Sequence, residues 1–85
     1  MRVARDPQFI REFTALPKTM QERATQKLAL FLENPRHPSL RVKKMEGRGN
    51  VWEARITRDY RFTFEIIGDL CKLRRIGTHD ILKRP

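Results

Sequence analysis

The chain contains few of the residues on which metal and nucleophile sites are usually built. Its 85 residues include one cysteine, Cys71, and two histidines, His37 and His79, which are far apart in the sequence. A lone cysteine forbids an intrachain disulfide and is typical of a reducing compartment. Zinc sites need clustered Cys and His ligands, and neither histidine has such a neighbour. Ser39 is the only serine, so a serine nucleophile is poorly supported. We therefore expect neither a metal nor another cofactor.

Long apolar runs and glycine-rich phosphate loops are also missing. No stretch is suited to a signal peptide or a membrane span, and no Walker or dinucleotide-binding motif is present. We expect a cytoplasmic protein with no membrane partner. The length suggests a single domain over residues 1–85.

Positive charge, in contrast, is abundant. Nineteen Lys and Arg residues face ten Asp and Glu residues, for a formal net charge of +9. Such an excess on a small domain favours a polyanionic partner, such as nucleic acid or an acidic protein.

The stretch from residue 51 to residue 79 alternates between apolar and polar residues. This period indicates three antiparallel strands over 51–57, 60–67 and 70–77, with a two-residue turn at Gly68-Asp69 and a three-residue loop at 57–59. One face is predicted to be apolar, with Trp52, Ala54, Ile56, Tyr60, Phe62, Phe64, Ile66, Cys71 and Leu73. The other face is predicted to be largely charged, with Glu53, Arg55, Arg61, Thr63, Glu65, Lys72 and Arg74.

The position of Arg75 conflicts with this pattern. The two-residue turn pairs Thr63 with Arg74, and strict alternation then places Arg75 on the face of Cys71 and Leu73. Arg75 can reach the charged face only if it lies beyond the edge of the core, or if a β-bulge reverses the alternation.

The first half of the chain is predicted to be mostly helical. A short edge strand at 1–5 is followed by a helix over 7–15, which Asp6 caps and Pro7 begins. Pro17 separates it from a second helix over 18–33, and a loop at 34–39 leads to a short strand at 40–45. The sequence thus predicts an α+β fold, with a helical hairpin packed on one face of a mostly antiparallel four- to five-stranded sheet.

A cationic sheet face with a histidine at its edge suits the cleavage of RNA. The 2′-hydroxyl can attack the adjacent phosphorus, so the protein needs only to orient the nucleotide, move protons and stabilise the phosphorane. Arginine matches phosphate oxygens with its planar donors, and histidine is a suitable proton donor because it titrates near neutral pH. A lysine acts as a base only when it is unprotonated, which neighbouring cations favour.

Several motifs resemble the RelE/ParE superfamily of toxins. Asp59-Tyr60-Arg61-Phe62-Thr63-Phe64 is similar to the strand of RelE-type toxins that carries a phosphate-binding arginine. Arg75-Ile76-Gly77-Thr78-His79 resembles the catalytic ending of the YafQ-like branch. Asn34-Pro35 and Val51-Trp52, with Arg55 and Ile56, recur at similar places, so the likeness covers nearly the whole chain.

The resemblance implies roles for individual residues. Arg61 would hold the scissile phosphate, Arg75 would stabilise the transition state and His79 would be the general acid. The general base stays open between Lys43, Lys44 and Glu46, because the YafQ-like branch has a histidine in that region. The residues expected to bind the substrate are Arg48, Arg55, Asp59 and Arg74.

The resemblance further implies a type II toxin that cleaves mRNA in the ribosomal A site without a metal. Its partners would be an acidic antitoxin and the ribosome. Two alternatives remain: a ParE-like inhibitor of DNA gyrase, against which His79 beside Arg75 argues, and a non-catalytic RNA-binding module.

Overall fold

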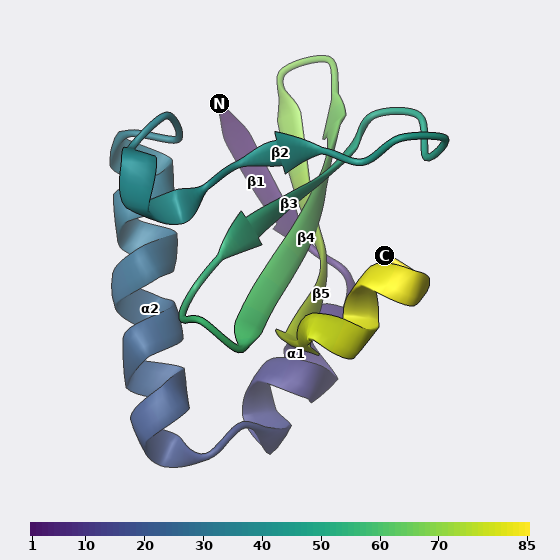
Figure 1. Cartoon of the computed structure of the whole chain (residues 1–85). Coiled ribbons are helices and arrows are strands. Elements are labelled where there is room, and N and C mark those ends of the chain that lie inside the picture. The colour runs from purple at the N-terminus through teal and green to yellow at the C-terminus, as the bar shows by residue number, and fades with distance from the viewer.

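The computed structural model describes all 85 residues and confirms the α+β class. One five-stranded sheet has the strand order β1-β5-β4-β3-β2, in which β1 is parallel to β5 and the other pairs are antiparallel. Helices α1 and α2 lie behind and beside the sheet, and the C-terminal turn lies in front of it (Figure 1). The elements are β1 (Arg2–Arg5), α1 (Pro7–Ala15), α2 (Lys18–Glu33), the 3₁₀ turn η1 (Pro38–Leu40), β2 (Lys43–Lys44), β3 (Val51–Arg55), β4 (Tyr60–Ile67), β5 (Leu70–Thr78) and the 3₁₀ turn η2 (His79–Lys83). None of the helices is long and apolar enough to cross a bilayer.

The strand register agrees with the alternation of the sequence. Gly68 adopts φ +61° at the β4–β5 turn, and Ile67 pairs with Leu70 as the two-residue turn requires. Arg55 pairs with Arg61, which leaves residues 57–59 as the three-residue loop, although β3 ends two residues earlier than predicted. The predicted apolar face is therefore confirmed as the face that forms the core.

The prediction that Thr63 pairs with Arg74 is wrong. The register shifts between Thr63 and Phe64, so that Thr63 pairs with Arg75 and Phe64 with Leu73, and Arg74 becomes the extra residue of a β-bulge. The bulge reverses the alternation along β5. Arg75 consequently moves to the polar face, and Ile76, which is 1% exposed, takes the core position.

The core joins the sheet to α2 through aromatic rings. Phe31 of α2 lies with its ring centroid 5.3 Å from that of Phe62 and 4.7 Å from that of Phe64. Cys71 is fully buried in the same cluster, and this burial raises the pKa of its thiol to about 11.

The predicted strand at 40–45 is much shorter in the structure. Leu40 ends the turn η1 and is completely buried, while Arg41 adopts the left-handed conformation with φ 46°. Left-handed backbone cannot continue a strand, so pairing with β3 is limited to Lys43 and Lys44.

Asp6 caps α1 as predicted. Its carboxylate accepts a hydrogen bond from the backbone N–H of Gln8 at 2.8 Å and lies 3.6 Å from the ammonium of Lys72. The backbone hydrogen bond, followed by the charge of Lys72, holds the pKa of Asp6 below its usual value. A carboxyl whose pKa is lowered by folding contributes stability above its unfolded pKa of about 3.9 and loses it as the pH falls through the folded value.

Replacement of this cap tests its contribution to stability. We expect Asp6→Ala to lower the free energy of unfolding at neutral pH by about 1 kcal/mol, and the melting temperature by roughly 4–8 °C. Asp6→Asn, which retains a capping oxygen, should lose less. The deficit of the alanine variant should shrink in melts below about pH 4. A deficit that is the same at neutral and acidic pH would contradict a contribution from the charge.

Candidate functional site

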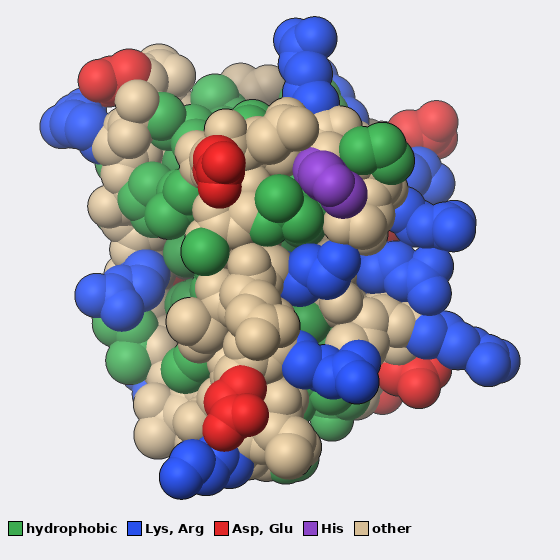
Figure 2. Space-filling view, turned by 90° about the vertical axis from the view of Figure 1, so that its left-hand side faces the viewer, with side chains coloured by type: hydrophobic (Ala, Val, Ile, Leu, Met, Phe, Trp, Pro, Cys, Tyr) green, Lys and Arg blue, Asp and Glu red, His purple; other side chains and the backbone are tan.

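The polar face of the sheet brings together most of the predicted site residues. Directly opposite residues of antiparallel strands share a face. One row across the sheet therefore contains Lys43, Glu53, Thr63 and Arg75, and the next row contains Arg55, Arg61 and Gly77. We call this surface the polar face. It faces the viewer in Figure 1, and Lys and Arg side chains crowd the corresponding right-hand edge of Figure 2.

Arg55 and Arg61 form an uncompensated pair of like charges at the end of this surface next to the loop between β3 and β4. One terminal nitrogen of Arg61, Nη1, donates to the carbonyl oxygens of Thr57 at 2.7 Å, Arg58 at 3.0 Å and Tyr60 at 3.1 Å. None of the five ion pairs of the chain includes Arg55 or Arg61. Like charges directly opposite one another in a sheet are destabilising, so an anion bound between them would relieve a cost that the fold maintains.

Asp59 and His79 lie at the same end of the sheet as this arginine pair. Tyr60 pairs with Thr78, and Asp59 precedes Tyr60 just as His79 follows Thr78. Both side chains are exposed. The register thus places a carboxylate just before β4, the strand of Arg61, and an imidazole just after the neighbouring strand β5.

Arg75 has reached the polar face, but its guanidinium is already occupied. It binds the Glu12 carboxylate of α1 through Nε at 3.3 Å and Nη2 at 2.6 Å, and its Nη1 donates to the carbonyl of Arg84 at 3.0 Å. The hydrogen bond to Glu12 raises the pKa of Arg75, which is only 22% exposed. Contact between Arg75 and a substrate phosphate requires the displacement of Glu12.

The C-terminal residues cover part of the polar face. Arg48 donates to the carbonyl of Lys83 at 3.0 Å, and both Thr63 and Arg74 donate to the carbonyl of Pro85, at 3.0 and 3.1 Å. Arg74 also forms an ion pair with Glu65 at 2.7 Å. Arg48 and Arg74, both expected to bind the substrate, therefore bind the backbone of this segment. They border an open hollow of about 400 Å³ lined by Arg48, Val51, Glu65, Arg74, Arg84 and Pro85.

Sequence reasoning missed this covering segment, although one residue signals it. A Cβ atom at Gly77 would lie 2.9 Å from Cγ2 of Ile81, so Ile81 packs directly over the glycine. An isolated glycine within a strand often marks such a close approach. Ile81 is accordingly 5% exposed.

The two lysines considered as general base lie on different faces. Lys43 pairs with Glu53 and belongs to the polar face, whereas Lys44 pairs with Trp52 and shares the core-side face. Glu46 lies beyond β2 in the loop that leads to β3 and is exposed. Of the three candidates, Lys43 is the one on the face that carries Arg61.

No family sequence model and no curated protein sequence matches the chain. Its structure, in contrast, is similar to solved toxin structures. YafQ from E. coli strain BL21(DE3) superposes with a TM-score of 0.80 at 16% identity, over 96% of this chain and 98% of that one. RelE in the archaeal RelE–RelB complex from Pyrococcus horikoshii OT3 superposes with a TM-score of 0.71 at 23% identity, over 91% and 92%.

A third structure, described as a YoeB/ParE toxin from Agrobacterium tumefaciens, has a TM-score of 0.76 at 15% identity and covers 93% of this chain and 99% of that one. These matches span almost the full length of each protein. They confirm, at the level of architecture, the resemblance that the motifs of the sequence suggested. The chain has the RelE/YafQ-like toxin fold.

Proposed function

We propose that this chain is the toxin of a type II toxin–antitoxin pair and that it cleaves mRNA on its polar face. The observation that carries the proposal is the pair formed by Arg55 and Arg61, two cations in direct register without a counter-ion. A phosphate diester bound between them would supply the missing negative charge. The fold adds support, because the similar structures include toxins in complex with antitoxins.

The proposed reaction needs no nucleophile from the protein. The 2′-hydroxyl of the bound nucleotide attacks the phosphorus, and the 5′-oxygen of the next nucleotide leaves. Arg61 and Arg55 bind the phosphate oxygens and stabilise the charge that develops in the transition state. His79 donates a proton to the leaving oxygen. A bound metal is not part of this mechanism.

Lys43 is our candidate for the group that removes the proton from the 2′-hydroxyl. Its pairing with Glu53 gives it the same face as Arg61, and it extends from the neighbouring row. Arg75 takes a supporting role in the proposal, since Glu12 already binds it. The antitoxin and the ribosomal A site are the proposed partners, and the formal net charge of +9 suits both.

Expression of the chain alone, without an antitoxin, tests the function. We expect growth arrest and new 5′ ends within mRNA, both suppressed by His79→Ala and by Lys43→Ala. Lys44→Ala is the matched control, because it removes the same charge from the adjacent residue on the other face, and it should leave cleavage within about twofold. Growth arrest with intact mRNA and blocked DNA supercoiling would refute the proposal in favour of a gyrase inhibitor.

A further inference from the structure

A second cavity lies away from the polar face, where the loop after α2 meets β3. Its volume is about 370 Å³, and it is lined by Pro35, Arg36, His37, Pro38, Arg41, Val42 and Trp52. Trp52 belongs to the face of the sheet opposite Arg61, since it pairs with Phe64 of the core. The cavity is therefore separate from the site proposed for cleavage.

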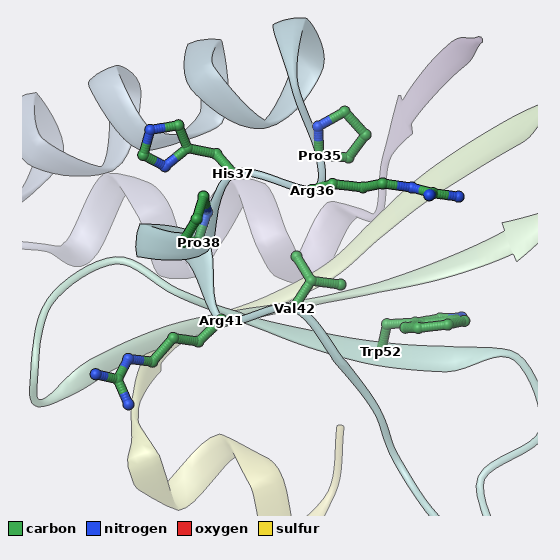
Figure 3. Close-up of a pocket in the computed structure, with 7 residues that line it drawn as sticks. All are labelled: Pro35, Arg36, His37, Pro38, Arg41, Val42 and Trp52. Atoms are coloured by element: carbon green, nitrogen blue, oxygen red, sulfur yellow. The ribbon is translucent and has the colours of Figure 1, made fainter.

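Trp52 gives this cavity an aromatic wall. Its indole is only partly buried and lies nearly parallel to the ring of Phe64, with an interplanar angle of 10° and a centroid distance of 6.3 Å. Figure 3 shows the indole edge-on, with Val42 and the extended side chain of Arg36 on one side of its plane. A flat group that enters between Arg36 and Trp52 would thus meet an aromatic surface below and a guanidinium above.

The charged side chains that line the cavity, those of Arg36 and Arg41, are both cationic. Arg36 and Arg41 are exposed and belong to no ion pair, and no Asp or Glu lines the space. Arg36 shares a side of the cavity with Trp52, whereas Arg41 and His37 lie on the other side (Figure 3). An anionic ligand with a planar part fits this arrangement.

The loop that carries these residues is held in place by its own contacts. Asn34 Oδ1 accepts a hydrogen bond from the backbone N–H of Arg36 at 3.2 Å. His37 Nδ1 accepts one from the backbone N–H of Ser39 at 3.2 Å, and Lys27 of α2 donates to the Ser39 hydroxyl at 2.9 Å. Pro35 and Pro38 restrict the backbone further. The backbone that carries Arg36 and His37 is therefore held in place by contacts within the chain.

We propose that this cavity binds one nucleotide of single-stranded RNA, with the base stacked on Trp52 and its phosphate at Arg36. Stacking on an aromatic ring combined with a nearby cation is the usual means of binding unpaired nucleotides. An acidic peptide would satisfy the arginine and leave the indole without a partner. RNA as the ligand rests on the proposed function, but the site and its residues differ from those of cleavage.

Trp52 is the only tryptophan, so its fluorescence reports directly on the cavity. We expect hexaadenylate to quench this fluorescence, and Arg36→Ala to weaken binding about fivefold and to lower the slope of log K against log salt by about 0.7. Arg11→Ala is the matched control, because Arg11 is an exposed arginine of α1 that does not line the cavity. With fluorescein-labelled hexaadenylate, Trp52→Leu should weaken binding between about 5- and 150-fold.

Three results would overturn the inference. The first is an equal loss of hexaadenylate affinity in Arg36→Ala and Arg11→Ala, and the second is binding of hexaadenylate without quenching of the Trp52 fluorescence. The third is hexaglutamate that quenches this fluorescence and binds as strongly as the RNA. Arg61→Ala separates this inference from the proposed function. This substitution should lower the cleavage rate by about 10²–10³-fold and leave quenching unchanged. Quenching in a chain that never cuts RNA would refute the proposed cleavage alone, and cleavage without quenching would refute the second site alone.

Discussion

Arg61→Ala is expected to lower the rate of RNA cleavage by about 10²–10³-fold, the loss seen when a single donor to a developing oxyanion is removed from an enzyme. Arg61 lies directly opposite Arg55, and the two cations together would bind the phosphate. The substitution leaves Arg55 alone to stabilise the negative charge of the transition state. Arg61→Lys keeps the charge but not the planar pair of donors, so it should recover only part of the rate. The measurement is the single-turnover rate of mRNA cleavage by the purified protein with translating ribosomes.

Arg58→Ala provides the control for this experiment. Arg58 is an exposed arginine of the loop that precedes β4, and its backbone carbonyl, which the substitution keeps, accepts a hydrogen bond from Arg61. Its removal changes the net charge equally and should leave the rate within about threefold. Because Arg61 also donates to the carbonyls of Thr57 and Tyr60, thermal melts must accompany the rates. A folded Arg61→Ala protein that cuts RNA at the normal rate would contradict the proposed site.

Phe31→Ala is expected to lower the free energy of unfolding more than the other stability variants proposed, Asp6→Ala and Leu32→Ala. Phe31 is 1% exposed and joins α2 to the sheet through its contacts with Phe62 and Phe64. Truncation of a buried phenylalanine costs about 3–5 kcal/mol, and a chain of this length is stabilised by only about 4–13 kcal/mol in total. The variant should lose at least about a quarter of its stability, with a melting temperature lower by about 12 °C or more.

Leu32→Ala is the matched control, because Leu32 is the next residue of the same helix and is 51% exposed. It should lower the free energy of unfolding by less than about 1 kcal/mol. Urea unfolding followed by the fluorescence of Trp52 measures both variants. Similar midpoints for the two proteins would contradict the role of Phe31 as the link between helix and sheet.

Much of the fold could be predicted because the sequence carries short-range signals of both kinds of element. Asp6-Pro7 and Pro17 delimit the helices, and the bounds predicted for α1 and α2 agree with the structure. Gly68-Asp69 and the period-two pattern determine the register of β4 with β5 up to Phe64. These signals are local, since each depends on residues that are neighbours in the chain or across one turn.

The contacts of Arg75 could not be predicted in this way. Its ion pair with Glu12 joins residues 63 positions apart. Its place on the polar face depends on a β-bulge, and the alternation of apolar and polar residues does not show where that bulge lies. The covering of Arg48 and Arg74 by the C-terminal residues is likewise a contact between distant segments. The roles of these three arginines in binding a substrate remain predictions.

The sequence by itself determined which residues of the sheet face the core up to the bulge at Arg74, because burial of apolar side chains dictates the register wherever one face of a strand is covered. Only the tertiary structure decided which cations are free. Arg75, Arg74 and Arg48 are bound to a carboxylate or to carbonyl groups from distant parts of the chain. Arg61 binds carbonyls of its own neighbourhood through Nη1 alone, and neither Arg55 nor Arg61 has a counter-ion. The availability of a guanidinium depends on which acceptors the fold brings within about 3 Å, and sequence spacing does not encode that distance.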